Sequence, residues 1–558
     1  MLNIYDVTMV ELSYPGVYVV ETPPVARAMT AASTSTASFI GMTERGPTGE
    51  AMLVTSLTEF FDKFGSFTTK NKMGIKGAQE NDVYLPYAVW SFFQNGGSKC
   101  YIIRIAPNAN AARIVVTAGG KPGADEPPKE GEIPAEVKFS ATEAPFGEAE
   151  APVEKDSLFR IWASSRGVWG NNLQILVGKG SDQIIINKDG KDVKEDTFRI
   201  DVKLNGAVVE SHDGLTMRPD NQRSVKTMIN DSSKLVRITQ TSDNTALPTE
   251  ATYKLEGGSA GNDVTNKEIV TQLTDGTSVL DKVTNVSLIS APGYSDGEIA
   301  NAGFKYAEGH RNHLGDAFFI AEVPKMVDTR DEGLKYVKSL TPGVNGYGSV
   351  YFPWMKVRDQ LGTGRNPITL VPPSGFVAGV FARIDNTRGV WKTPAGAEAS
   401  VAGVLGLTAN LTDKDQGVIN LAGLNAIRNF PGKGTLIWGG RTPSPDIAWR
   451  YLSVRRMANF LKSSIFDGIQ WAVFEPNDAP LWGALKMNIE GFMRDLFRQG
   501  AFQGSSTEEA FFVKCDAETT TSTDQQNGLV NVLVGFAPLK PAEFIVIKLS
   551  QKMSEAAA

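Results

Sequence analysis

The stretch TLIWGGRT, residues 435–442, opens the most strongly patterned part of the sequence. Its apolar run followed by two glycines predicts a buried strand with a sharp exit. Two amphipathic segments follow, separated by WAVFEPN at 471–477, and the sequence then reaches PAEFIVIKL at 541–549. The last stretch is an apolar run behind a proline, which predicts another strand. Because a strand needs a partner edge for its backbone groups, we expect edge pairing to organise this chain.

The two amphipathic segments are predicted to be helices. The first is expected to start from an N-cap at Ser444 or Asp446. Its apolar residues recur at spacings of three and four, at Ile447, Tyr451, Val454, Ala458, Leu461 and Ile465. The second stripe consists of Leu481, Leu485, Ile489, Phe492 and Leu496. Both stripes have the period of a helix with one buried face, and Lys486, Arg494 and Arg498 lie off the second stripe.

Length and composition narrow the class of protein. A chain of 558 residues with 41% hydrophobic residues has room for three or four domains. The net charge of -6, with both signs mixed, favours neither nucleic acid nor an anionic membrane surface as a partner. We expect no transmembrane helix and no secretory signal. The two cysteines, Cys100 and Cys515, fit no metal-ligand spacing and favour a reducing cytoplasm, although a disulfide between them stays open.

The N-terminal part is expected to be an extended arm followed by an α/β region. GVYVVE at 16–21 is a predicted strand between prolines, either an ordinary first strand or an arm that pairs with another subunit. From 27 to 107, strand, helix and strand alternate, which favours a layered α/β core. Ser56 and Glu59 predict a capping box at one helix, and Asn95 with two glycines ends another.

Residues 108–297 are predicted to form a β-rich inserted region. Within it, 118–156 is poor in large apolar residues and is expected to be an exposed or disordered segment. Strands are expected at 158–163, 173–177, 197–204, 234–238 and 286–289. The α/β core is expected to resume over 298–370, with strands at 318–323 and 348–352. Residues 371–535 then form a C-terminal α/β domain, and 536–558 a second extended arm.

Two groups of residues are candidates for a catalytic or metal site. GGSAG at 257–261 matches a nucleophile elbow centred on Ser259, but the polar residues after it favour a plain glycine turn. His310 and His313 share a helix face near Asp316, yet a metal needs further ligands, so two solvated surface histidines are favoured. A serine hydrolase therefore stays only a remote alternative, and we expect no metal, no cofactor and no enzyme activity.

Phosphate binding is not favoured by the sequence. No phosphate loop and no dinucleotide-binding glycine motif is present. Arg450, Arg455 and Arg456 form a basic group that phosphate would suit. In an acidic chain, a solvated helix flank or pairing with acids is the favoured interpretation.

Many of these stretches resemble, in the same order, the tail sheath proteins of contractile phage tails and related contractile injection systems. In the C-terminal third the matching motifs are WGGRT at 438–442, WRYLSVRR at 449–456, VFEPN at 473–477, LW at 481–482, EAFFVKCD at 509–516, GFAP at 535–538 and PAEF at 541–544. Upstream, they are YPGVY at 14–18, PPSG at 372–375 and RGVW at 388–391. Gly440 stands where the family pattern has Ala, and 108–300 matches weakly.

The resemblance implies a multidomain mixed α/β subunit. In such proteins an inner C-terminal domain faces the tail tube, which here would be 371–535, and inserted outer domains face solvent. Extended arms at both ends add strands to sheets of neighbouring copies. The residues expected to exchange between subunits are Val17, Tyr18, Val19 and Val20 at one end and Phe544, Ile545, Val546 and Ile547 at the other.

The resemblance also implies a mechanical function. The chain would polymerise as a helical sleeve around the tail tube and contract to drive the tube through a target envelope, delivering a phage genome or, alternatively, the protein effectors of an injection system. Its partners would be itself, the tube protein, and the baseplate and tail terminator proteins, with no nucleic acid and no membrane insertion. The sleeve would be part of a virion tail assembled in the host cytoplasm. Lys486, Arg494 and Arg498 are candidates for tube contact, the alternative being that they are solvated or paired within the sheath.

Overall fold

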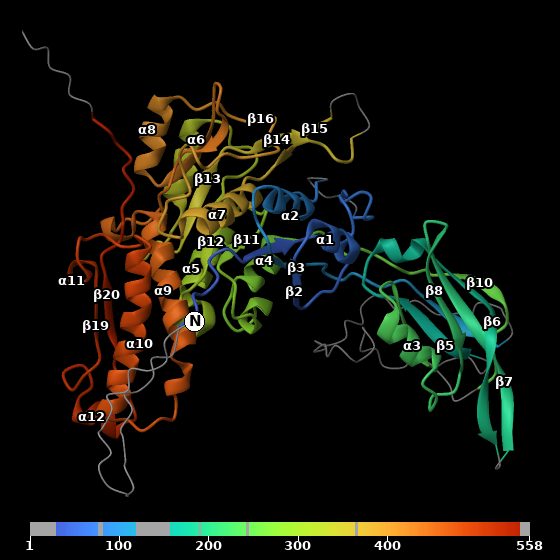
Figure 1. Ribbon diagram of the computed structural model, residues 1–558. Helices are drawn as coiled ribbons and strands as arrows, with labels where there is room; N and C mark the ends of the chain where they lie inside the picture. Colours follow the sequence, from blue (N-terminus) through green and yellow to red (C-terminus); the bar gives the residue numbers. More distant parts are fainter. Residues whose placement is uncertain are drawn as a thin grey trace, which may run out of the picture. The chain divides into compact units, whose positions relative to one another are not determined.

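The computed structural model describes residues 29–75, 82–118, 157–188, 191–240, 245–362 and 367–546. The arm residues 16–21, the segment 119–156 and residues 547–549 lie outside this range, so their predictions stay untested. The chain divides into two compact units, Ala32–Ser463 with Pro538–Ala558, and Met1–Ala31 with Ser464–Ala537. The elements alternate between helices and strands in several sheets, which confirms the mixed α/β fold class (Figure 1).

An eight-stranded sheet forms the centre of the larger unit, in the order β18-β17-β13-β12-β11-β1-β3-β2. The six strands from β17 to β3 run parallel, and β18 and β2 pair antiparallel at the two edges. The strands are β1 (Ala37–Gly41), β2 (Ala51–Val54), β3 (Cys100–Arg104), β11 (Leu288–Ser290), β12 (Phe318–Glu322), β13 (Gly348–Phe352), β17 (Leu424–Phe430) and β18 (Gly434–Ile437).

Helices cover both faces of this sheet (Figure 1). In β12, Phe318 and Ile320 enter one apolar cluster, whereas Phe319 and Ala321 enter the other. This alternation follows from the two-residue period of a strand, and it explains why the parallel strands read as continuous apolar runs. One layer holds α1 (Leu57–Phe64), α2 (Leu85–Gln94) and α7 (Ser374–Arg388), and the other α4 (Asn266–Gln272), α5 (Gly297–His313), α6 (Arg330–Ser339) and α8 (Asp413–Leu421).

The predicted caps are largely confirmed. Ser56 accepts from the backbone of Glu59 as expected, but the Glu59 carboxylate accepts from Thr55, so only half of the capping box forms. Asn95 caps α2. The longest helix stripe needs a correction: α9 (Leu452–Gly468) starts later than expected, after a 3-10 turn at Ile447–Trp449 that Asp446 caps. Ile447 is 68% exposed because it lies on that turn and outside the helix.

The inserted region is β-rich, as predicted. A three-stranded sheet, β4-β5-β9, and a four-stranded sheet, β10-β6-β7-β8, are both antiparallel and share one apolar cluster with α3 (Val225–Ser232). Their strands are β4 (Arg113–Thr117), β5 (Ser157–Ala163), β6 (Leu173–Lys188), β7 (Lys191–Leu204), β8 (Ala207–Leu215), β9 (Val236–Gln240) and β10 (Ala251–Lys254).

Two stretches belong to the central sheet instead of the regions expected from the sequence. β11 was expected in the β-rich insertion, yet it pairs with β1 and β12. β17 and β18, expected in a separate C-terminal domain, extend the same sheet beyond β13. A small sheet of β14 (Met355–Arg358), β15 (Ile368–Val371) and β16 (Gly406–Leu407) completes the larger unit. Local patterns identify strands, but the sheet that each strand joins depends on long-range packing.

The smaller unit contains the end of α9, then α10 (Ala479–Arg498), α11 (Thr507–Ala510), β19 (Phe511–Lys514), α12 (Ser522–Gln526) and β20 (Leu533–Phe536). All five stripe residues of the second predicted helix are buried on α10, which confirms that helix. Cys100 and Cys515 are buried and free, so they form no disulfide. Across the described residues, we find no helix with the length and apolarity needed to cross a membrane.

Candidate assembly surfaces

Among its described residues, the smaller unit has a two-stranded sheet in which β19 and β20 pair antiparallel. Ala537 N donates to Ala510 O, 2.8 Å away, at the end of this ladder. Hydrogen-bonded and non-bonded pairs alternate along an antiparallel ladder. The pair Val513 and Val534 is therefore of the non-bonded kind, and its backbone N–H and C=O groups point away from the partner strand. The sheet thus offers backbone donors and acceptors along both outer edges.

Side chains also leave this small sheet incomplete. Phe512 and Leu533 are each 54% exposed, whereas Val513 is buried. Beneath it, a small apolar cluster joins α10 to Cys515, where burial raises the pKa of the thiol and keeps it protonated. A two-stranded sheet with one covered face is marginal by itself, so added strands would stabilise it.

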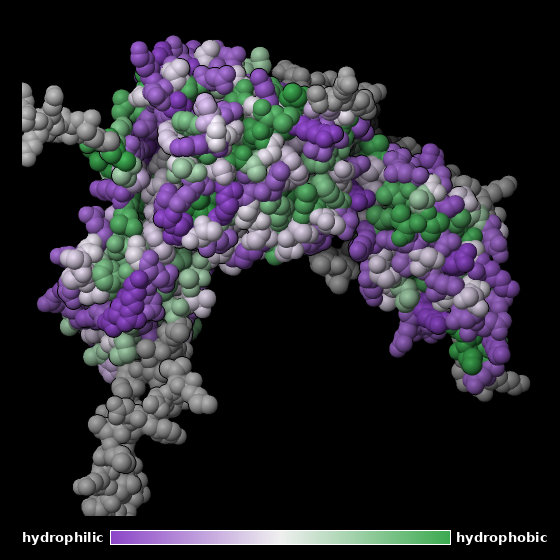
Figure 2. Space-filling model, turned by 45° about the horizontal axis from the view of Figure 1, so that its top comes forward, coloured by the Kyte–Doolittle hydropathy of each residue, from purple (hydrophilic) through white to green (hydrophobic). Residues whose placement is uncertain are grey.

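The C-terminal segment Pro538–Val546 belongs to the larger unit and forms no strand. The isolated chain therefore shows no strand at 541–546, and the predicted pairing of this stretch with another copy stays a prediction. Its apolar residues are largely in solvent, with Phe544 at 75%, Ile545 at 83% and Val546 at 78% exposure. Figure 2 shows apolar side chains gathered where the coloured part of this segment ends. A strand pattern without a partner edge stays unpaired, because a single strand cannot satisfy its own backbone groups.

One residue of this segment is held firmly. The Glu543 carboxylate accepts from the Arg441 guanidinium, with Nε 2.9 Å from Oε1 and a further bond from Nη2 to Oε2. Both side chains are largely buried, and Glu543 raises the pKa of Arg441. This pair was not predicted from the sequence, although Glu543 is the one charge within the apolar run 541–547 and could have been singled out by that.

The three tube-facing candidates lie on α10 off its buried stripe. Lys486 is partly exposed and lies 3.8 Å from Glu490, and Arg498 lies 3.3 Å from Asp495. Arg494 is exposed. Exposed pairs of this kind stabilise a helix by only about 0.3–0.5 kcal/mol. These charges are thus available to a partner at little cost, and whether they meet the tube stays a prediction.

The basic group on α9 differs from the solvated flank that the sequence favoured. Arg456 is buried and forms an ion pair with buried Asp385, with Nη1 3.0 Å from Oδ1. Arg455 is buried too, and its guanidinium lies 3.4 Å from the ring centre of Trp449. Burial lowers the pKa of Arg455. The two side chains hold α9 on the α/β body, so they are part of the core.

The histidine prediction also needs a correction. His310 is 1% exposed, not solvated, and its Nδ1 lies 2.7 Å from Asp316 Oδ1. Asp316 also accepts from Arg311 and from Ser463 of α9. The side chain of His313 lies outside the described residues. In the described ranges, no group of three or more His, Cys, Asp or Glu side chains is placed to hold a metal ion.

Ser259 lies in a glycine turn, as the sequence favoured. Gly257 and Gly261 have positive φ, and a Cβ on Gly261 would lie 1.9 Å from Pro107 O. Ser259 pairs with Asn110 through its backbone, and its hydroxyl accepts from Asn110 N at 3.2 Å. The next helix, α4, begins only at Asn266, so the strand–turn–helix geometry of a nucleophile elbow is missing here.

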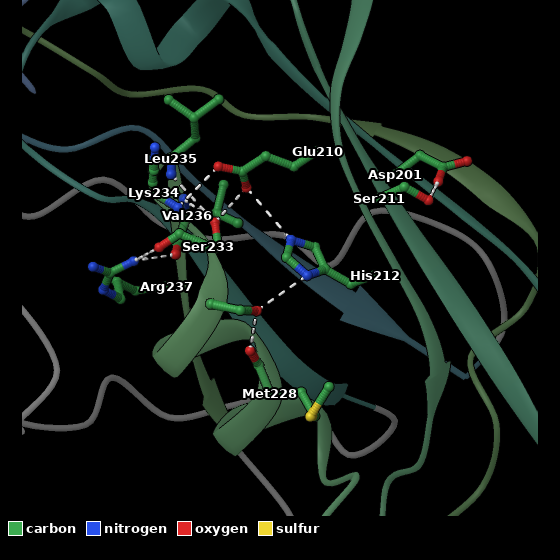
Figure 3. A network of polar contacts seen from close by, with 11 residues as sticks. Asp201, Glu210, Ser211, His212, Met228, Ser233, Lys234, Leu235, Val236 and Arg237 are labelled. Atoms are coloured by element: carbon green, nitrogen blue, oxygen red, sulfur yellow. Dashed lines mark hydrogen bonds and ion pairs between the residues drawn. The ribbon is translucent and has the colours of Figure 1, made fainter. Parts of the chain in front are cut away.

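In the insertion, His212 and Glu210 belong to a network of polar contacts (Figure 3). His212 Nδ1 lies 3.2 Å from Ser232 Oγ, and Nε2 lies 3.5 Å from Glu210. The Ser232 hydroxyl donates to the carbonyl of Met228, so its oxygen accepts from the His212 ring. A nucleophile needs the opposite polarity, with the histidine taking the serine proton. Glu210 also accepts from Ser233 and from Lys234 N, and this network joins α3 to β8.

Comparison with known proteins agrees with this architecture. Residues 262–443 match the phage tail sheath protein central domain, and 444–552 match the phage tail sheath C-terminal domain. The chain is 26% identical over 190 residues to the tail sheath protein of Vibrio phage KVP40, covering 33% of this chain and 27% of that protein. It is 26% identical over 269 residues to a putative prophage major tail sheath protein of Pseudomonas aeruginosa strain UCBPP-PA14, covering 46% and 62%.

A solved structure shares the fold over almost the whole chain. The helical sheath of the anti-feeding prophage in its contracted state superposes with a TM-score of 0.54 at 20% identity, covering 97% of this chain and 99% of that one. The two matched domains together occupy more than half of the sequence. The chain therefore belongs to the phage tail sheath family. Its alignments span less than two thirds of the length of the two curated relatives.

Proposed function

We propose that this chain is the structural subunit of a contractile tail sheath. It polymerises as a helical sleeve around a tail tube and contracts by rearrangement of rigid subunits. The movement drives the tube through the envelope of a target cell. In a phage this movement delivers the genome. The sleeve is then part of the virion tail, which is assembled in the host cytoplasm.

One observation carries the proposal: the chain has an unfinished sheet and apolar residues that pair with none of its described strands. The outer edges of β19 and β20 offer backbone groups, and Phe544, Ile545 and Val546 are exposed apolar residues in an extended segment. An extended segment that adds to an open edge gains a row of backbone hydrogen bonds. If the edge belongs to another copy and the contact does not close on itself, repetition generates a helical filament.

Contraction needs subunits that move without deforming. The α/β body has apolar clusters on both faces of its sheet and a buried Arg456–Asp385 pair, so it suits movement as one rigid body. The extended sleeve would be a long-lived state of higher free energy, held by kinetic stability. Exchanged arms would tether neighbours while the new lattice forms.

The proposed partners are further copies of this chain, the tail tube protein, and the baseplate and terminator proteins at the two ends of the sleeve. We propose that 371–535 faces the tube and that the β-rich region within 108–297 faces outward. Lys486, Arg494 and Arg498 on α10 would meet acidic side chains of the tube. Such contacts must be weak, because they have to break when the sleeve contracts.

An injection system that delivers protein effectors is the second candidate. It is favoured by the likeness to the anti-feeding prophage sheath along almost the whole chain. The two candidates differ in the particle, not in the subunit. Electron microscopy of the native particle would distinguish them, because a phage carries a capsid on the tail.

The test is assembly of the purified chain, imaged by negative-stain electron microscopy. Cylinders or rings are expected. Deleting residues 1–22 should leave a folded body, judged by circular dichroism, while abolishing the sleeve. Normal polymerisation of that truncation would refute strand exchange at the N-terminal end. A monomer with a turnover that Ser259→Ala removes would instead identify an enzyme.

A further inference from the structure

Arg441 is held in place by contacts that do not involve the C-terminal segment. Its backbone N–H donates to the side chain of Asn425, 2.8 Å away, and its carbonyl accepts from the same side chain. Its Nη1 donates to Asn420 O at 3.2 Å, and the guanidinium lies 5.9 Å from the ring centre of Tyr451. Asn425 is wholly buried in β17. The position of Arg441 is therefore fixed by the α/β body.

Glu543, in the C-terminal segment, binds the side chain of Arg441. Its two oxygens face Nε and Nη2, the planar fork that suits a carboxylate. The Arg441 and Glu543 side chains are 6% and 16% exposed, so solvent screens the pair only weakly. In the described part of the segment, Pro538–Val546, Glu543 is the residue whose side chain forms hydrogen bonds, and its oxygens accept them.

The contact divides the segment into two parts. At Glu543 the chain is attached to its own body, and the next three residues are 75–83% exposed. Successive residues of an extended chain point to opposite sides. If this segment joins a sheet as a strand, Phe544 and Ile545 place apolar side chains on both of its faces, which suits a strand enclosed in a sheet.

We infer that the Arg441–Glu543 pair is the pivot of the C-terminal arm: it holds the arm on its own subunit and sets the residue from which the arm reaches a second copy. The inference rests on the proposed function, because it assumes that the residues after Glu543 pair with a neighbour. A free segment would lose more conformational entropy on pairing. A pivot at a fixed residue also sets the register of the strand that follows.

The experiment compares full-length variants by sedimentation and negative-stain microscopy across protein concentrations. Glu543→Gln keeps the shape and removes the charge, and it should raise the concentration needed for assembly by about tenfold. Glu250→Gln, at an exposed glutamate of the insertion, is the matched control and should assemble as the unaltered chain does. Thermal unfolding of each variant checks that the body is folded.

Charge reversal tests whether the pair lies within one subunit. Arg441→Glu and Glu543→Arg should each impair assembly, and the two together in one chain should restore it. A mixture of the two single variants should not restore assembly. Recovery in the mixture would overturn the inference, because the pair would then form between copies.

The failure of the inference is distinguishable from that of the proposed function. If Glu543→Gln assembles normally while deletion of residues 544–558 abolishes the sleeve, the pivot is wrong and the exchange of arms stands. If that deletion also assembles normally, C-terminal strand exchange is wrong, and the pivot with it.

Discussion

The eight-stranded sheet and the two-stranded sheet of this chain differ in whether other segments cover their outer edges. At the outer edge of the large sheet, the segment after Gly396 covers β18: Val401 N donates to Thr435 O, and Ile437 N donates to Ala399 O. Helices cover both of its faces. The small sheet has two strands, outward backbone groups at Val513 and Val534, and half-exposed side chains. Among the described residues, one chain thus contains a large sheet whose β18 edge is covered and a small sheet whose two edges are open.

The largest expected effect is a loss of stability of the α/β body. Arg456→Ala leaves Asp385 buried without its partner, and burial already raises the pKa of that carboxyl. We expect the free energy of unfolding to fall by about 3–5 kcal/mol, measured by chemical denaturation. Arg358→Ala, at an exposed position of β14, should change it by less than about 0.5 kcal/mol. Equal losses would show that the buried pair does not hold the body.

A pH effect is expected at the carboxyl end of the same sheet. Burial raises the pKa of Glu322 from 4.5 to about 7, although its carboxylate accepts from Gly293 N and Ser374 N. Because the folded state binds this proton more tightly, the stabilisation is full below about pH 4.5 and is lost as pH rises through 7. The loss reaches about 3 kcal/mol.

The measurement is the free energy of unfolding between pH 5 and pH 8. Glu322→Gln should flatten the part of the slope due to this group, since an amide does not titrate. An unchanged slope in this variant would assign the pH dependence to other groups.

A smaller effect, on assembly, is expected from a substitution at the open edge of the two-stranded sheet. Val534→Pro removes an N–H that points to the outer edge of β20 and leaves the ladder with β19 in place. We expect a folded chain that needs about tenfold more protein to assemble. Leu533→Pro removes an N–H inside the ladder and should instead destabilise the sheet itself. If both variants assemble normally, this edge takes no strand from a neighbour.

The smallest effect concerns the charges on α10. Replacing Lys486, Arg494 and Arg498 with Ala should leave the free energy of unfolding within about 0.5 kcal/mol, since the charges are exposed or only partly buried. Binding to the purified tube protein should weaken severalfold at low salt and little at high salt, because salt screens exposed charges. Unchanged co-sedimentation at low salt would leave these residues solvated or paired within the sheath.

Local sequence patterns predicted the helices and strands whose formation depends on a single stretch of sequence. The strand at 348–352 is found as expected, because a short run buried on both faces is typical of a parallel sheet. The buried stripe of α10 is found as expected, because a repeat of three and four residues fixes which side of a helix is apolar. The helix at Leu452 was predicted to begin too early, since Ile447 fits the repeat although it lies on a 3-10 turn. His310 and Arg455 were predicted to be exposed but are buried, because segments distant in the sequence also pack around them: Ser463 contacts Asp316, the partner of His310, and Tyr347 contacts Arg455.

The sequence by itself determined the class of fold, the strands and helices of the α/β body, and the family resemblance. Tertiary structure decided which strands share a sheet, which charges are buried, and where Glu543 attaches. The physical reason is that backbone and side-chain periodicity act over a few residues. The Arg441–Glu543 contact, by contrast, joins groups far apart in the chain, and folding alone brings them together.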